Sequence, residues 1–240
     1  MNNVYLHSLF KNGCLEPTFD NKLMSSLLSS KCETCCLSKS HILPFPIHRA
    51  RALSSFDIIH TDVWGIAPTL SRTGFKYYVT FIDDHSRFTW IYFMRFKSEV
   101  FSLFQKFYNM VHTQFQKAIK ILRSDSGGEY MSHDFSAFLS DKGILHQKSC
   151  PHTPQQNGVA ERKNRHILET VRTLLLESLV PPTFWCGAAQ TAVYLLNRHP
   201  SSILGKTTPY EALFGHTPSY SHLRIFGCLC FVHLPPTGRT

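Results

Sequence analysis

Residues 56–62 read FDIIHTD, an apolar run typical of a buried β-strand that ends on the carboxylate of Asp62. Residues 119–125 read IKILRSD, a similar run that ends on Asp125 and is closely followed by two glycines, which indicate a turn. Carboxylates that converge at strand ends supply the hard oxygen ligands that Mg²⁺ or Mn²⁺ prefers. The two runs therefore predict a divalent-metal site of the kind used for phosphoryl transfer on nucleic-acid backbones.

A third carboxylate, Glu161, opens a long helical pattern, and 35 residues (126–160) separate it from Asp125. When each residue turns by 100°, one helix face is apolar, another is basic, and Glu161 lies on the border between them. The apolar face carries Ile167, Leu168, Val171, Leu174, Leu175 and Leu179, and the basic face carries Arg162, Arg165, His166 and Arg172. This pattern fits a metal ligand beside a phosphate-binding face. It also fits a glutamate that stabilises the helix N-terminus and a basic face that is only solvated.

The rest of the chain predicts a mixed α/β fold. Strand patterns cover residues 56–63, 76–83, 87–95, 119–125 and 144–149, and helical patterns cover 98–116, 133–141, 157–179 and 183–198. Short turns join the first three strands, which predicts an antiparallel meander because parallel neighbours need long crossovers. Alternating helices and strands follow, and they favour a mixed sheet with helices on its faces. Residues 227–232 form one more short strand-like run.

The composition fits a globular protein with a polyanionic partner. The 240 residues are 43% hydrophobic and 17% charged, which excludes an intrinsically disordered chain. The net charge of +9 and the pI of about 9.2 favour nucleic acid as the partner, although many soluble proteins are also mildly basic. No run of about 18 apolar residues occurs, so the sequence predicts no membrane span.

Residues 1–46 are rich in Ser and Cys and end in a Pro-Phe-Pro segment, which indicates a separate small unit and a linker. Within them, Cys32 and Cys35 have the spacing of a zinc-ligand pair, a pattern that also arises by chance. We expect the eight cysteines to be thiols or metal ligands and not disulfides. Four are expected to be buried as small apolar side chains: Cys150, Cys186, Cys228 and Cys230.

Six further stretches carry a family resemblance. They are HTDVWG at 60–65, YVTFIDDHSR at 78–87, LRSDSGGEY at 122–130, TPQQNGVAERKNR at 153–165, TPYEALFG at 208–215 and LRIFGC at 223–228. Together they resemble the retroviral-type integrase core of copia-type long-terminal-repeat retrotransposons. The similarity spans nearly all of residues 30–235, and the stretch at 153–165 is the strongest match.

The resemblance implies an RNase H-like fold, in which helices flank a five-stranded mixed sheet. It implies that Asp62, Asp125 and Glu161 form a catalytic triad that binds two Mg²⁺ or Mn²⁺ ions, with the family's 35-residue spacing between the last two. The ions would activate a water or a DNA 3′-hydroxyl for in-line attack on a phosphodiester. The expected substrate is double-stranded DNA, both element ends and target, and the expected function is DNA integration.

Other acidic residues are expected to have structural roles. Asp83 and Asp84 lie in a predicted turn, where hydrogen bonding accounts for them. On a regular strand, Asp57 would point to the sheet face opposite the triad. Glu129 follows the two glycines and is not a ligand in the resembling family. That family usually has Asn where this chain has Ser126, which we expect to shape the loop without binding metal.

The resemblance also implies a domain organisation. A partial zinc-binding module covers residues 1–46, the catalytic core covers 47–215, and a C-terminal extension starts over 216–240. In the family, two upstream histidines complete the zinc site with a Cys-x-x-Cys pair, but here only one histidine precedes Cys32. We therefore expect a piece of a longer polyprotein that holds Zn²⁺ in its intact form.

DNA contacts are expected from the long helix and from the end of the fifth strand, at Arg162, Lys163, Arg165, Arg172 and Lys148. We further expect a homo-oligomer that acts in the nucleus and in a cytoplasmic virus-like particle. Two alternative functions stay open. One is a catalytically inactive nucleic-acid-binding remnant of a retrotransposon, and the other is a nuclease of the same fold class that cuts without joining.

Overall fold

The structure is a computed structural model that describes residues 51–150 and 157–230. The chain divides into two units, residues 1–49 and 50–240, and all the described residues belong to the second. The predicted zinc ligands Cys32 and Cys35 lie outside the described residues, so their role stays a prediction.

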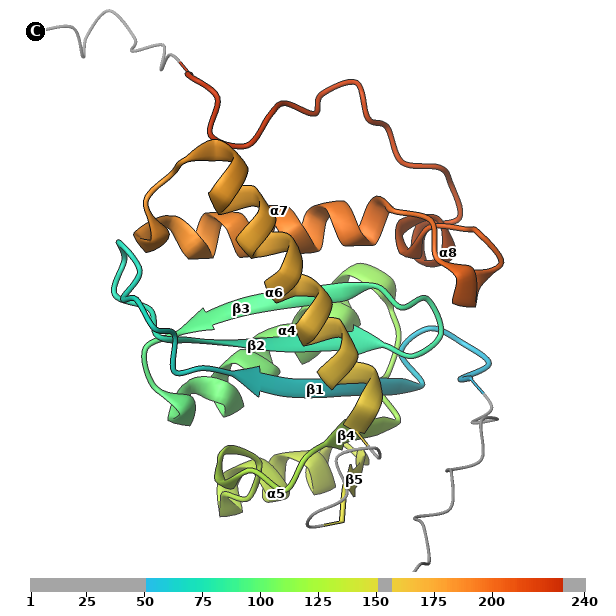
Figure 1. The fold of residues 1–240 in the computed structure, drawn as a ribbon. Helices are drawn as coiled ribbons and strands as arrows, with labels where there is room; N and C mark the ends of the chain where they lie inside the picture. The colour runs from blue at the N-terminus through green and yellow to red at the C-terminus, as the bar shows by residue number, and fades with distance from the viewer. Residues whose placement is uncertain (1–50, 151–156, 231–240) are drawn as a thin grey trace, which may run out of the picture. The chain divides into compact units, whose positions relative to one another are not determined.

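Five strands form one mixed sheet (Figure 1). In chain order they are β1 (Ile58–Trp64), β2 (Tyr77–Asp83), β3 (Thr89–Met94), β4 (Ile121–Ser124) and β5 (Leu145–Lys148). Their order in space is β3-β2-β1-β4-β5. The first three strands pair antiparallel, whereas β4 lies parallel to both β1 and β5. The predicted five-stranded mixed sheet and its antiparallel meander are confirmed.

Helices cover both faces of this sheet. They are α4 (Val100–Phe115), α5 (His133–Asp141), α6 (Gly158–Ser178), α7 (Trp185–Arg198) and the short α8 (Pro209–Phe214), and a 3₁₀ turn, η2, covers Gly128–Tyr130. Figure 1 shows α6 crossing the sheet, with its N-terminal end beside β4 and β5. Each of the four longer helices lies within two residues of its predicted range. No described helix is both long and apolar enough to cross a bilayer.

Two apolar cores lie on opposite faces of the sheet, because successive side chains of a strand alternate between its faces. On β2, Val79 and Phe81 pack with α4 and α5, where Phe104, Phe107 and Phe135 are fully buried. On the other face, Tyr78 packs with α6 and α7. The sheet is therefore fixed from both sides, and its central strand β1 is held rigidly.

Three expectations about burial or structure are wrong. Leu179 was placed on the apolar helix face, but it is the left-handed C-terminal cap of α6 and is 89% exposed. Of the four cysteines expected to be buried, only Cys186, on α7, is half-buried. Cys150, Cys228 and Cys230 are exposed because these three lie in connecting segments outside both cores. Residues 227–230, the described part of the strand-like run, form no strand.

Candidate active site

Asp62 lies near the end of β1, two residues before Trp64, and Asp125 directly follows the neighbouring parallel strand β4. β1 and β4 pair with His60 opposite Arg123, and continuing that register by two residues places Asp62 beside Asp125. Adjacent strands are about 4.8 Å apart, and residues two apart share a face. The sheet therefore brings together two of the three predicted carboxylates, on the face that α6 covers.

Two hydrogen bonds fix the carboxylate of Asp62. The side-chain amide of Asn164 on α6 donates to Oδ2 at 2.9 Å, and the backbone amide of Val63 donates to Oδ1 at 3.0 Å. Thr80 on β2 donates its hydroxyl to Oδ1 of Asn164 at 3.4 Å. The buried Asn164 thus connects the helix to the strand at the carboxylate itself.

The electrostatics of Asp62 show that other acids are near. Burial raises the pKa of Asp62 to about 6, and the charges of Asp125 and, more weakly, Glu161 add to the rise. The hydrogen bonds from Asn164 and Val63 act in the opposite direction. Within the described residues, no three or more His, Cys, Asp or Glu side chains are grouped so that they could hold a metal ion. Asp125 and Glu161 therefore act on the charge of Asp62, but the three carboxylates are not arranged as a metal-binding group.

Glu161 reaches this region from the first turn of α6. It precedes Asn164 by three residues, and such positions are neighbours on a helix, about 5–6 Å apart between Cβ atoms. Because Asn164 contacts Asp62 directly, α6 is anchored at the strand end with Glu161 one turn away. Glu161 itself is exposed to solvent.

The loop after β4 is tied to both neighbouring strands. Oδ1 of Asp125 accepts a hydrogen bond from the amide of Gly127 at 3.1 Å. The hydroxyl of Ser126 donates to the carbonyl oxygen of Ser149 after β5 at 2.8 Å, so this residue shapes the loop in the structure. On the other side, the buried Tyr130 shares a hydrogen bond of 2.9 Å with Thr61 on β1.

Two carboxyl groups crowd the space beside Gly127. A Cβ atom on Gly127 would lie 2.9 Å from the carboxylate of Glu129 and 3.0 Å from Oδ1 of Asp125. A larger residue would therefore push the flexible end of Glu129 aside and shift Asp125 by a small amount. Glu129 is partly neutralised by Lys97, whose Nζ lies 3.3 Å from its Oε1.

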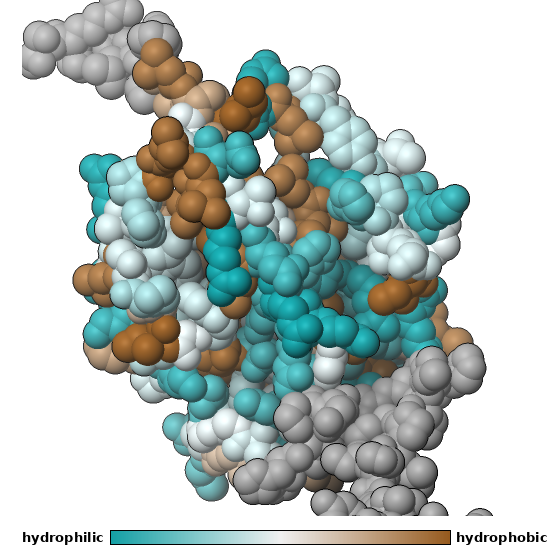
Figure 2. Space-filling model, viewed as in Figure 1, coloured by the Kyte–Doolittle hydropathy of each residue, from teal (hydrophilic) through white to brown (hydrophobic). Residues whose placement is uncertain are grey.

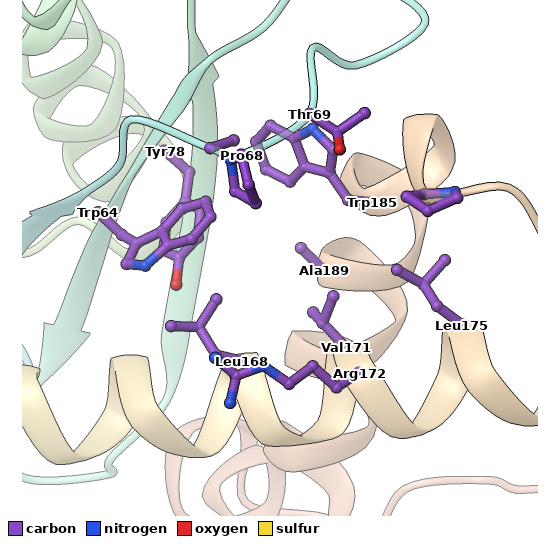
Figure 3. Close-up of a pocket in the computed structure, with 12 residues that line it drawn as sticks. Trp64, Pro68, Thr69, Tyr78, Leu168, Val171, Arg172, Leu175, Trp185 and Ala189 are labelled. Atoms are coloured by element: carbon purple, nitrogen blue, oxygen red, sulfur yellow. The ribbon is translucent and has the colours of Figure 1, made fainter.

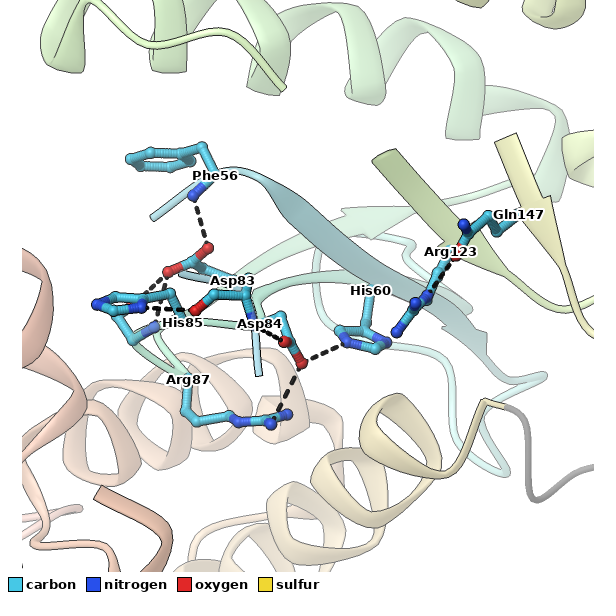
Figure 4. Close-up of polar contacts among 10 residues, drawn as sticks. Phe56, His60, Asp83, Asp84, His85, Arg87, Arg123 and Gln147 are labelled. Atoms are coloured by element: carbon cyan, nitrogen blue, oxygen red, sulfur yellow. Dashed lines mark hydrogen bonds and ion pairs between the residues drawn. The ribbon is translucent and has the colours of Figure 1, made fainter. Parts of the chain in front are cut away.

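The remaining acids have structural partners (Figure 4). Asp83 accepts hydrogen bonds from the amide of Phe56 at 2.7 Å and from Ser86. Asp84 contacts His60 at 2.8 Å and Arg87 at 3.2 Å. Burial alone would raise the pKa of Asp84, but the hydrogen bonds from His60 and the Ala52 amide and the charge of Arg87 lower it to about 2. Burial also lowers the pKa of His60, against the opposing effect of Asp84.

Asp57 is paired with a surface lysine at the far end of the strand. Its carboxylate lies 2.6 Å from Nζ of Lys120, at the start of β1 and away from the end that carries Asp62. It therefore has no part in the acidic cluster.

The basic residues predicted to bind DNA have different environments. Arg162 and Arg165 are exposed on the first turns of α6, where Figure 2 shows hydrophilic side chains gathered. Lys163 is half-buried, and burial together with the nearby Arg87 lowers its pKa to about 8. Arg172 is exposed farther along α6, beside an apolar hollow. Arg162, Arg165 and Arg172 are therefore exposed, as expected for the basic face of α6, whereas Lys163 is set apart by its burial.

Lys148 is exposed at the end of β5 but belongs to the other side of the sheet. It pairs with Ser124, whose hydroxyl turns toward His146 on the face covered by α5. The side chain of Lys148 therefore starts on the sheet face opposite the one that carries Asp62.

Sequence reasoning missed Asn164 as a residue that positions Asp62. A signal exists, because Asn164 falls at 300° on the helical wheel, within the apolar sector where an amide is out of place. The buried Asn157, whose side-chain amide donates to the carbonyl of Thr61 at 3.4 Å, was missed as well. Its position before α6 gave no comparable signal.

Comparisons with known proteins agree with this geometry. Residues 53–154 match the integrase core domain family. The Pol polyprotein of transposon TNT 1-94 from Nicotiana tabacum is 45% identical over 209 residues, covering 87% of this chain and 16% of that polyprotein. Transposon RE2 of Arabidopsis thaliana is 42% identical over 208 residues, covering 87% and 14%. The chain thus spans about a sixth or less of the length of these relatives.

Solved retroviral structures share the fold at low sequence identity. A simian T-cell lymphotropic virus intasome chain matches with a TM-score of 0.63 and 17% identity, covering 100% of this chain and 80% of that one. The HTLV-2 integrase catalytic core domain matches with a TM-score of 0.52 and 19% identity, covering 68% and 99%. These likenesses agree with the RNase H-like arrangement of the sheet. The 45% and 42% identity to transposon Pol polyproteins shows the family. The chain belongs to the integrase core family, in the copia-type form that these polyproteins carry.

Proposed function

We propose that this chain is the catalytic core of a metal-dependent polynucleotidyl transferase that processes retrotransposon DNA ends and joins them to target DNA. The observation that supports the proposal best is the adjacency of Asp62 and Asp125, with Asn164 holding the helix of Glu161 against the same strand end. A non-catalytic protein would gain nothing from placing like charges next to a buried carboxylate whose pKa they raise, as they do for Asp62. The family membership points to the same chemistry.

The donor set fits Mg²⁺ or Mn²⁺. Asp62, Asp125 and Glu161 offer only hard oxygen atoms. Burial and, after it, repulsion from the nearby acids raise the pKa of Asp62, and a divalent cation would relieve that repulsion. The HTLV-2 catalytic core, which shares the fold, was solved in complex with magnesium. When bound, two such ions would activate a water or a DNA 3′-hydroxyl and stabilise the leaving oxygen.

The protein's own groups supply position and charge. Asn164 holds one oxygen of Asp62, and the Thr61–Tyr130 bond keeps the loop of Asp125 beside β1. In this proposal Arg162 and Arg165, which are exposed close to Glu161, bind the phosphates of a DNA duplex. In this proposal the chain works as a homo-oligomer on element and target DNA, in the nucleus and in a cytoplasmic particle.

A strand-joining assay tests the proposal. Purified protein is incubated with Mn²⁺ and a duplex that mimics an element end, and we expect joined products from the wild type. Asp62→Asn, Asp125→Asn and Glu161→Gln should each abolish joining. Asp57→Asn is the matched control, because it makes the same chemical change in a surface ion pair outside the cluster.

Three results would contradict the proposal. Nicked strands without branched products would indicate a nuclease. DNA binding without any product, unchanged by Asp62→Asn, would indicate an inactive remnant. Equal activity of Asp57→Asn and Asp62→Asn would show that the acidic cluster is not catalytic.

A further inference from the structure

An aromatic hollow lies next to Asp62 on the same face of the sheet (Figure 3). It lies between β1, β2, α6 and α7, and Trp64, Tyr78, Leu168 and Trp185 form much of its wall. Trp64 pairs with Tyr78 in the β1–β2 register, two residues beyond Asp62. Two residues of an antiparallel strand span about 7 Å, so the hollow begins close to the candidate metal ligand.

Two buried polar atoms in this wall have no hydrogen-bond partner in the described part of the chain. They are the hydroxyl of Tyr78, a residue that is 0% exposed, and the indole nitrogen of Trp185, a residue that is 7% exposed. Folded proteins normally pair such groups, because an unsatisfied buried donor is unfavourable. Figure 3 shows the Tyr78 hydroxyl pointing toward Leu168 and the indole nitrogen of Trp185 beside Thr69. The Tyr78 hydroxyl therefore offers a donor to a ligand that carries an acceptor.

The shape and charge of the wall define the ligand further. Trp64 stacks on Tyr78 with ring centroids 5.1 Å apart and an interplanar angle of 23°, and Trp185 meets Trp64 edge-on at 5.8 Å. The exposed Arg172 adds a positive charge to an otherwise apolar lining. Flat aromatic surfaces beside a cation are the elements with which proteins hold single bases attached to a phosphate backbone.

We propose that this hollow receives one unpaired base of a DNA strand whose backbone passes Asp62. The proposal rests on the proposed function only in taking DNA as the substrate. The base packs against the Trp64 side of the hollow, the Tyr78 hydroxyl donates to one of its acceptor atoms, and Arg172 contacts the adjoining phosphate. A base within a duplex cannot enter, so the strand is unpaired at that point.

A binding titration with the full chain tests the site without metal or joining. The probe is dGMP, because guanine presents two acceptors, N7 and O6, on one edge. Tryptophan fluorescence reports binding, since two of the three tryptophans line the hollow. With EDTA present, we expect a saturable change with dGMP and none over the same range with 2-deoxyribose 5-phosphate, which lacks the base.

Single substitutions locate the site. Tyr78→Phe should weaken dGMP binding about tenfold while leaving the melting temperature unchanged or higher, because the lost hydroxyl has no partner in the free protein. Leu168→Trp should fill the hollow and abolish binding. Tyr92→Phe is the matched control, because its register partner Val79 places it on the opposite face of the sheet, and its dGMP affinity should equal that of the wild type.

Several results would overturn the base site. One is equal binding of the base-free sugar phosphate, and another is no fluorescence response to dGMP. Wild-type affinity in Tyr78→Phe or Leu168→Trp would also contradict the site, as would a lowered melting temperature in Tyr78→Phe. Because the titration needs neither metal nor catalysis, an inactive joining reaction does not affect its outcome.

Discussion

Asn164 on α6 donates its side-chain amide to Oδ2 of Asp62 on β1 across 2.9 Å. This bond joins the helix that carries Glu161 to the strand that carries Asp62. It also favours the ionised form of Asp62, against burial and the nearby acids. The bond therefore acts on both the geometry and the charge of the candidate site.

Removing this donor should raise the pKa of Asp62. In Asn164→Ala, the carboxylate loses a hydrogen bond that favours its ionised form, so its titration midpoint should move above the present value of about 6. Carbon-13 NMR of labelled aspartate side chains measures this midpoint directly.

Asn197→Ala is the control for that experiment. Asn197 is also a buried asparagine, but it bonds to both backbone groups of Thr89 at 2.8–2.9 Å. Its loss should lower the free energy of unfolding by about 2 kcal/mol and leave the pKa of Asp62 unchanged. A shift of equal size in both variants would show that the effect is not local to the Asn164–Asp62 bond.

Asp62→Asn should stabilise the metal-free protein at neutral pH. The pKa of Asp62 is 3.8 in its unperturbed state and about 6 in the fold, so the native state binds the proton more tightly. The free energy of unfolding therefore falls as pH rises from about 4 to 6. Because Asp62 is partly exposed, we expect a gain of about 2 kcal/mol at pH 7.

Urea denaturation at two pH values checks that prediction. At pH 7 the variant should unfold at higher urea than the wild type, and near pH 4 the two should coincide. Added Mg²⁺ should stabilise the wild type more than the variant. A variant that is less stable than the wild type at pH 7 would show that the ionised Asp62 does not destabilise the free protein.

Asp84→Asn should destabilise the fold without affecting metal binding. Asp84 has a pKa of about 2 in the fold, below the unperturbed 3.8, so its stabilisation is full above pH 4 and is lost as pH falls toward 2. The substitution leaves His60 and Arg87 without their carboxylate and should cost about 3 kcal/mol at pH 7. A Mg²⁺-dependent shift in melting temperature that matches the wild type would confirm the structural role.

Arg165→Glu should weaken binding to unrelated DNA sequences by similar factors, because phosphate contacts carry little sequence information. Its affinity should also depend less steeply on salt, by about one unit or more in the logarithmic slope. Lys106→Glu makes a similar charge reversal at an exposed position on α4, on the opposite side of the sheet. Fluorescence anisotropy with two unrelated duplexes should show a large change for Arg165→Glu and a small one for Lys106→Glu.

Local patterns were enough to predict the sheet, but not the first residues of β1. The run at 56–62 looked like one continuous strand, yet Phe56 has a left-handed backbone with φ of 73° and β1 starts at Ile58. The amide of Phe56 is held by Asp83, which is 27 residues away, so the turn depends on a tertiary contact. Periodicity within a short segment carries no information about such a partner.

The candidate site also has parts that local patterns predict and parts that depend on tertiary contacts. The positions of Asp62 and Asp125 followed from strand ends, and the position of Glu161 followed from the helical pattern. The contact of Asn164 with Asp62 depends on how α6 lies over β1, which no local pattern contains. Likewise Lys163 was grouped with the basic residues, although burial and the nearby Arg87 of the β2–β3 connection lower its pKa.

The parallel pairing of β1 with β4 also affects how this chain folds during its synthesis. His60 meets Arg123, 63 positions later in the chain, and α4 together with the whole β2–β3 hairpin is synthesised in between. Contacts between such distant segments form slowly, because a long loop must close first. A nascent chain that stops before β4 holds the first carboxylate alone, so under the proposed function the candidate site assembles only after β4 and α6 have been synthesised.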